Sequence, residues 1–189
     1  MTYRERRLKA VRFDHPDRIP IHMGMGNSCW QHYPQDALQQ LMADHPLLFP
    51  GFAPSPEPIR PRYVPWRRAD QPWTDSWGCV WETHEDGITG AVVDHALANW
   101  DALATYEPPS PDHHNGWQPI DWDDIRERLA VCRSHGSLCA GSLRHGHTFL
   151  TLTYLRGYEN LVLDMADEEP QLETLVGMVR DFNLGLVRR

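Results

Sequence analysis

Apolar side chains recur at helical spacing along much of the chain, and the clearest run lies near its end. Six apolar positions between Leu172 and Leu186 fall on one face of a helix, and Pro170 suits the first turn of that helix. The same spacing, or a capping residue before an apolar run, predicts shorter helices elsewhere. These helices follow the Thr2–Glu5 capping box, cover 35–44, follow Asn99, run from Asp121 to His135, and cover 149–155 and 159–165.

Short apolar or β-branched runs predict strands at three places. Residues 18–23 and 137–141 resemble buried strands, and strands separated by helices imply βα units and a parallel sheet. Residues 73–93 hold two β-rich runs around Asp86-Gly87, which predicts a β-hairpin. Residues 46–72 are rich in proline and have no period, so we expect either a functional loop or a covering segment there.

Net charge limits the class of partner. The chain has 189 residues, enough for one domain, and a net charge of −8. This acidity argues against binding to nucleic acid or to an anionic membrane surface, because phosphates are held by a basic face. The only basic cluster in the sequence comprises Arg60, Arg62, Arg67 and Arg68, and its proline-rich setting favours a solvated loop over an anion site.

Cysteine usage and hydropathy point to the cytosol. No run approaches the roughly 20 apolar residues of a membrane span, and no signal-peptide core follows the basic start of the chain. None of the four cysteines lies in a Cys-x-x-Cys pair, so we expect free thiols in a reducing cytoplasm. They are Cys29, Cys79, Cys132 and Cys139.

Three side chains are candidate catalytic residues. Tyr154 either donates a hydrogen bond to a substrate carboxylate or carbonyl, or packs in the core with its hydroxyl at the solvent. Asp75 lies in a tryptophan-rich turn, where it serves either in proton transfer or as a turn-forming residue before a packed Trp. His147 alternates with His145 after the predicted strand 137–141, where barrel active sites form. Two histidines lack a third ligand nearby, so we predict no metal site in this chain.

Several motifs, taken in order, resemble the uroporphyrinogen decarboxylase superfamily. The segments 4–10 and 16–20 are similar to the opening of that family, and Asp75-x-Trp77-Gly78-x-x-Trp81 is similar to a later motif. The resemblance continues through Gly87, through Trp100-x-x-Leu103-x-x-Tyr106-x-x-Pro109, through 154–160 and Asp164-Met165, and along the last helix to Asn183. It covers nearly the whole chain and depends on the order and spacing of motifs that are individually weak.

This resemblance implies an α/β fold, namely a (β/α)8 barrel in a protein of well over 300 residues. Residues 1–189 would then be the N-terminal half of an incomplete TIM barrel, with an N-terminal helix and an inserted β-hairpin. The last helix has no cap, and its apolar stripe suggests a partner surface beyond Arg189. A natural C-terminal helix that ends in Arg188 and Arg189 is the alternative, since both charges suit its dipole.

Two activities divide the family. True decarboxylases remove tetrapyrrole carboxyls without a cofactor and carry an arginine-containing run after the first strand, where this chain has Met23–Asn27 and no arginine. The hairpin motif is more similar to the branch that transfers methyl groups between a corrinoid and a thiol, whose zinc ligands lie in the second half of the barrel. The resemblance therefore implies methyl transfer with a corrinoid protein as partner, and carries over Tyr154 alone. Tetrapyrrole decarboxylation and a non-catalytic fragment or binding module remain the alternatives.

Overall fold

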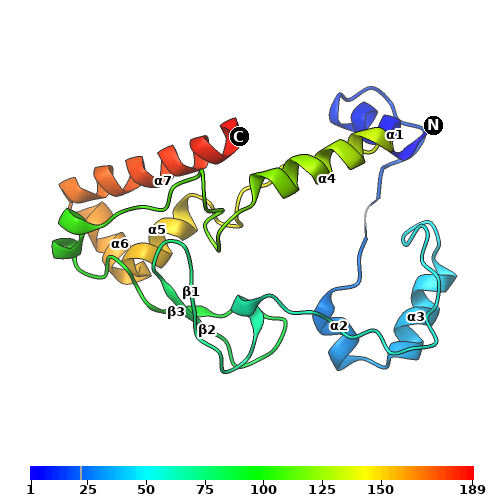
Figure 1. Cartoon of the computed structure of the whole chain (residues 1–189), viewed down its shortest axis with the longest axis horizontal. Helices are drawn as coiled ribbons and strands as arrows, with labels where there is room; N and C mark the ends of the chain where they lie inside the picture. The colour runs from blue at the N-terminus through cyan, green and yellow to red at the C-terminus, as the bar shows by residue number, and fades with distance from the viewer. Residues whose placement is uncertain (22) are drawn as a thin grey trace.

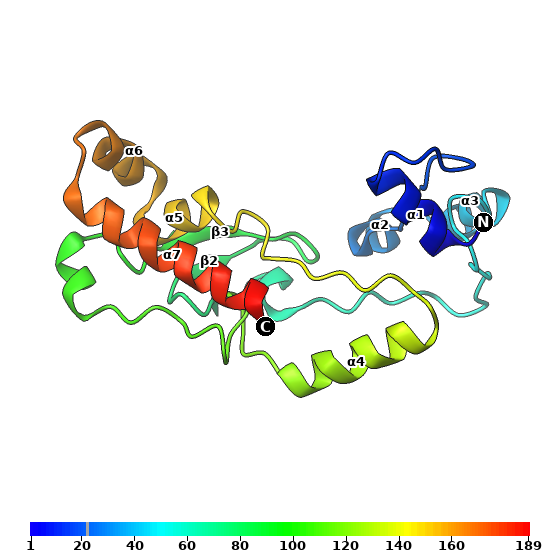
Figure 2. The ribbon, with the colours of Figure 1, turned by 90° about the horizontal axis from the view of Figure 1, so that it is seen from above.

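The computed structural model describes residues 1–21 and 23–189, which form helices and one small antiparallel sheet, a mixed α/β content. Both views show α5–α7 gathered on the sheet, with α1–α3 set apart from them (Figures 1 and 2). The helices are α1 (Tyr3–Val11), α2 (Asn27–His32), α3 (Gln35–Asp44), α4 (Trp122–Ser134), α5 (Phe149–Arg156), α6 (Tyr158–Ala166) and α7 (Pro170–Arg188), with the 3-10 helices η1 (Pro65–Arg67) and η2 (Trp100–Thr105).

The predicted helices are confirmed, and their caps follow the sequence signals. In α1, the Thr2 side chain accepts from the Glu5 backbone N–H, and the Glu5 side chain accepts from the Thr2 N–H. In α4, the Asp121 carboxylate accepts from two backbone N–H groups of the first turn. Only α2 was missed, because six residues without a side-chain cap give little periodicity.

The sheet consists of β1 (Trp73–Thr74), β2 (Val80–Glu82) and β3 (Ala91–Asp94), paired antiparallel in that order. Strands β2 and β3 form the hairpin predicted for 73–93, and the chain turns between them near Gly87, whose φ is 88°. The turn over residues 75–79 adds β1, so the hairpin gains a third strand. Trp81 in β2 lies opposite Trp73 on one side and Val92 on the other.

The prediction of strands at 18–23 and 137–141 is wrong for the described residues, since neither segment pairs with another strand. His22 lies outside the described residues. Ile19, Ile21 and Met23 are 79 %, 51 % and 52 % exposed rather than buried. An apolar run becomes a strand only where another strand satisfies its backbone groups, and the rest of the described chain offers these segments no such partner.

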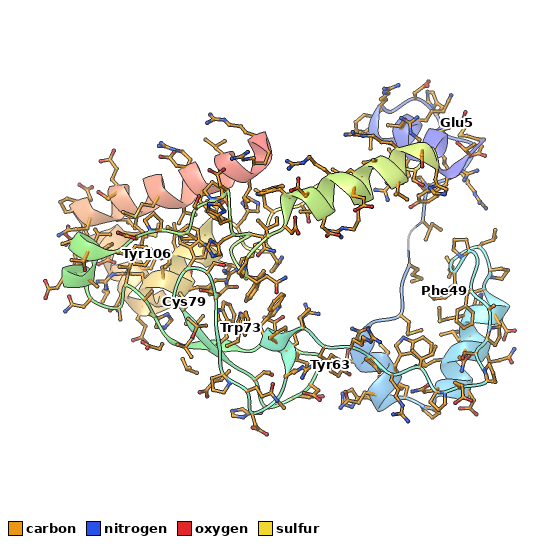
Figure 3. The ribbon with its side chains drawn as sticks, viewed as in Figure 1. Glu5, Phe49, Tyr63, Trp73, Cys79 and Tyr106 are labelled. Atoms are coloured by element: carbon orange, nitrogen blue, oxygen red, sulfur yellow. The ribbon has the colours of Figure 1, made fainter. Side chains whose placement is uncertain are left out.

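The main core lies between the sheet and helices α5–α7 (Figure 3, around Cys79 and Tyr106). On α7, Leu175, Val179 and Phe182 are buried, and the Phe182 ring meets the Trp77 ring edge-on at 4.8 Å. Most of the apolar stripe of α7 therefore packs against this chain's own residues, while Val176 stays 42 % exposed. The buried residues of this core are Trp77, Cys79, Trp81, Leu97, Leu152, Leu155, Leu161, Leu175, Val179 and Phe182.

Helix α4 contributes no buried residue to any core. It extends away from the sheet toward the side on which α1–α3 lie (Figure 2). Within residues 1–21 and 23–189, no helix combines the length and apolar character needed to cross a bilayer. The four cysteines are free, as predicted from their spacing.

Candidate functional site

A cleft of about 800 Å³ opens beside the sheet, and we call it the aromatic cleft. Its walls come from β2, β3, the segment around η1, the residue Trp117 and helix α5. No acidic side chain belongs to its lining, although the whole chain carries a net charge of −8. Its aromatic members are Trp66, Trp81, Trp117, Tyr154 and Tyr158, and its polar side chains are Arg67, Thr89, His95, His145 and Thr153.

The rings of the cleft pack on one another to form a continuous wall. Trp66 stacks on Trp117 with centroids 5.2 Å apart and planes within 6°. Trp81 meets Trp117 at 4.8 Å and meets Tyr154 edge-on at 4.6 Å. Rings fixed by such contacts line the cleft with preformed apolar surface, which is the usual lining of a small-molecule site.

Arg144 lies behind this wall and holds it in place. Its guanidinium carbon is 3.8 Å from the centroid of the Trp117 ring, 5.2 Å from that of Trp81 and 5.1 Å from that of Tyr154. All three distances lie within the roughly 6 Å range of a cation–π contact. Its Nη1 donates to the Gly116 carbonyl at 2.8 Å. Its Nε and Nη2 are buried without a hydrogen-bond partner. The attraction of the ring faces for the guanidinium charge therefore offsets the loss of water at these two nitrogens.

Asp75 is the anchor of Arg144 and does not line the cleft. One carboxylate oxygen accepts from the backbone N–H groups of Trp77 (2.9 Å) and Cys79 (3.0 Å). The other accepts from the Trp81 indole N–H and from Arg144 Nη1, both at 2.9 Å. A fully buried carboxylate with four donors has no position left for a substrate, so the structure favours the turn-forming interpretation of Asp75 over the catalytic one.

Tyr154 lines the cleft from α5, where its ring is half-buried. Helix α5 ends at Gly157, whose φ of 82° turns the chain into α6. The Tyr154 carbonyl at this helix end accepts from the His95 Nδ1 at 2.7 Å and from the Cys79 thiol at 3.2 Å. Side chains thus satisfy a carbonyl that the helix itself leaves open.

His147, the third predicted residue, lies outside the cleft and is exposed. Its Nδ1 contacts the Thr148 hydroxyl at 2.9 Å, and its carbonyl accepts from the Asn183 amide at 2.5 Å. The neighbouring His145 lines the cleft instead. In the part of the chain that the structure describes, no three His, Cys, Asp or Glu residues are grouped around a common point for a metal ion.

Two buried acidic groups near the site are held neutral. Burial, with a smaller effect from the Asp75 charge, raises the pKa of the Cys79 thiol to about 12. Burial likewise raises the pKa of Tyr106, whose hydroxyl donates to the Trp77 carbonyl at 2.8 Å. Cys79 is therefore a core residue with an inert thiol rather than a nucleophile.

The sequence did not reveal Arg144 and His95 as site residues, nor the rings of Trp66 and Trp117. Arg144 looked like one residue of a histidine-rich loop, and its role appears only when 144 meets 75 and 117 in space. His95 directly follows β3, and this position at a strand end was the available signal. Arg67 belonged to the basic cluster assigned to a solvated loop, whereas its side chain reaches the cleft and donates from Nε to the Thr89 hydroxyl at 2.9 Å.

Comparison of the chain with protein-family models, with curated proteins and with solved structures finds no match.

Proposed function

We propose that this chain forms part of an enzyme of the uroporphyrinogen decarboxylase superfamily, and that the aromatic cleft binds a flat ligand during methyl transfer between a corrinoid and an acceptor such as a thiol. The observation that carries the proposal is the position of Tyr154. It is the one residue that the sequence resemblance carries over, and it lines the aromatic cleft in contact with Trp81.

The shape and charge of the cleft support a flat ligand that is neutral or anionic. A volume of about 800 Å³ falls within the range of small-molecule sites, and stacked rings reward flat partners by about 0.5–1.5 kcal/mol beyond area burial. Because no carboxylate lines the cleft while Arg67, Thr89 and Thr153 do, its polar groups suit the amide or carboxylate side chains of a macrocycle.

The partial barrel is part of the same proposal. Residues 18–21 and 137–141 lie outside the helices and strands of the described chain, and the first of these segments exposes Ile19 and Ile21. Both segments would become buried parallel strands if neighbouring strands were added beside them. Free cysteines are consistent with the cytosolic location proposed for such an enzyme.

The zinc used by the methyltransferase branch does not fit the residues described here. They contain no group of three potential ligands, so no step through zinc is assigned to this chain. What the chain supplies in the proposal is the surface that binds the corrinoid or its substrate and excludes water from one face of it.

Arg67 favours tetrapyrrole decarboxylation as a second candidate. Its Nε donates a hydrogen bond to the Thr89 hydroxyl, and this bond directs the guanidinium toward the cleft. Because the cleft has no acidic group, the guanidinium could pair with a ligand carboxylate. The absence of an arginine from 23–27 argues in the other direction, because a substrate with many carboxylates needs several such partners.

Equilibrium dialysis of the chain against methylcobalamin and, separately, uroporphyrin tests the proposal. We expect the corrinoid to bind, and Trp66→Leu to weaken its binding about 2- to 10-fold, because the variant removes one stacked ring. The matched control is Trp122→Phe, since Trp122 lies on α4 and bonds to the Pro111 carbonyl away from the cleft.

Each outcome of the dialysis has a defined meaning. Stronger binding of uroporphyrin than of the corrinoid would replace methyl transfer by the decarboxylase candidate. Binding of neither macrocycle, or equal effects of the two tryptophan variants, would overturn the assignment of the cleft.

A further inference from the structure

His95 occupies a position in the aromatic cleft that neither the motifs nor the proposed function assigns. It follows β3 directly, lines the cleft, and is half-buried. Its imidazole is attached at one end, through Nδ1, to the Tyr154 carbonyl at 2.7 Å. Two residues later, the Leu97 backbone N–H donates to the Leu155 carbonyl at 2.9 Å, so the whole segment is fastened to the end of α5.

The contact with Tyr154 fixes the proton on His95. A carbonyl oxygen only accepts hydrogen bonds, so Nδ1 must carry the hydrogen and donate it. In the neutral imidazole, Nε2 is then left with a lone pair and acts as an acceptor. Among residues 1–21 and 23–189, none hydrogen-bonds to Nε2, and this atom is the free end of a ring whose orientation is already set.

Gly157 lies beside this end of the ring and places no side chain against it. A Cβ added at Gly157 would lie 3.4 Å from His95 Cδ2 and 3.5 Å from Nε2, in contact with the edge of the imidazole that carries the lone pair. The glycine also adopts a φ of 82°, which residues with a side chain rarely do. The joint between α5 and α6 therefore positions His95 and leaves room beside its acceptor atom.

We infer that His95 Nε2 is a hydrogen-bond acceptor in the aromatic cleft and selects flat ligands that carry an N–H or O–H donor at their edge. The half-buried rings of Trp66, Trp117 and Tyr154 line the cleft and provide the surface for such a ligand. Phenols and N–H heterocycles belong to this class, whereas their O- or N-methylated forms lack the donor. The inference rests on the proposed use of the cleft as a ligand site, but it does not depend on which macrocycle or reaction is involved.

A matched pair of ligands and a matched pair of variants test it. 2-Naphthol and 2-methoxynaphthalene have the same flat rings, and only the first has an O–H to donate. His95→Asn places an amide N–H where Nδ1 was, so it keeps the bond to the Tyr154 carbonyl and loses Nε2. His84→Asn is the control, because His84 does not line the cleft and its side chain is 92 % exposed.

Equilibrium dialysis of the whole chain should show that the wild type prefers 2-naphthol by about 3- to 10-fold, the usual net effect of one hydrogen bond. We expect His95→Asn to reduce this ratio to about 1 and His84→Asn to leave it unchanged. A wild-type ratio of 1, or a ratio that survives His95→Asn, would overturn the inference. Failure of both naphthalenes to bind would overturn it as well.

A second measurement does not depend on the variants folding. The nitrogen NMR spectrum of the wild-type chain labelled in histidine should show His95 as the Nδ1–H tautomer, with an Nε2 signal that moves when 2-naphthol is added. The opposite tautomer would contradict the structural argument directly. Because these ligands are not corrinoids, a failure here is separable from a failure of the macrocycle dialysis: either result can occur without the other.

Discussion

The buried ion pair between Asp75 and Arg144 gives the sharpest test of how the cleft is built. Asp75→Asn keeps the size of the side chain and one oxygen for the N–H groups of Trp77 and Cys79. It replaces the other oxygen by an NH2 group, which then faces two donors, Trp81 Nε1 and Arg144 Nη1. The variant therefore removes a charge and turns two hydrogen bonds into donor–donor contacts.

The expected cost is large because Arg144 cannot reach water. Its side chain is 4 % exposed and that of Asp75 is 0 % exposed. Removing one partner of a buried pair typically costs about 3–5 kcal/mol, since the remaining charge is left uncompensated. A domain of this size is stable by only about 5–15 kcal/mol, so the variant should lose a large fraction of its stability.

Urea unfolding, followed by tryptophan fluorescence and by circular dichroism, measures this cost. Asp123→Asn is the control, because the Asp123–Arg126 pair is exposed (89 % and 66 %) and should be worth less than about 1 kcal/mol. The double variant Asp75→Asn with Arg144→Met should be more stable than Asp75→Asn alone, because the unpaired charge is gone. A loss below about 1 kcal/mol for Asp75→Asn would refute the anchoring role.

Three further predictions concern other parts of the fold. Gly157→Ala should lower stability by about 1–3 kcal/mol in thermal unfolding, because φ is 82° there, while Gly141→Ala, with no atom near its added Cβ, should not lower it. The pKa of Cys79 is raised from 9.0 to about 12, so the contribution of its neutral thiol to folding stability is complete below pH 9 and is lost as pH rises toward 12. The midpoint of urea unfolding should therefore fall between pH 9 and pH 12, and should fall less in Cys79→Ala. The Arg6 hydrogen bond lowers the pKa of Asp17 from 3.8 to about 2, so hydrogen-exchange protection of α1 should decrease as pH falls from 3.8 toward 2, and Asp17→Asn should remove that dependence.

Local signals in the sequence were sufficient for the longer helices and the hairpin, but not for α2 or η1. The stripe of α7 and the cap at Asp121 are determined by residues within a few positions of one another, and both elements formed where predicted. The strands predicted at 18–23 and 137–141 failed because a strand depends on a distant partner, which the pattern of a single segment does not reveal.

The same reason explains what could be foreseen of the site. Tyr154 was identified from a local motif and lines the cleft, while Asp75 was placed correctly in a turn but its four donors come from 77, 79, 81 and 144. Arg144 and His95 have no local signature, since their roles arise from contacts 69 and 59 residues away along the chain.

This long-range origin of the cleft has a consequence for how the molecule acquires it. The wall takes its rings from positions 66, 81, 117 and 154, and the cation behind it comes from 144. Bringing these distant positions together closes long loops of the chain, and only the contacts of the assembled wall offset the entropic cost of closing them. The binding surface should therefore appear late and all at once during folding, and no peptide excised from a single stretch should reproduce it.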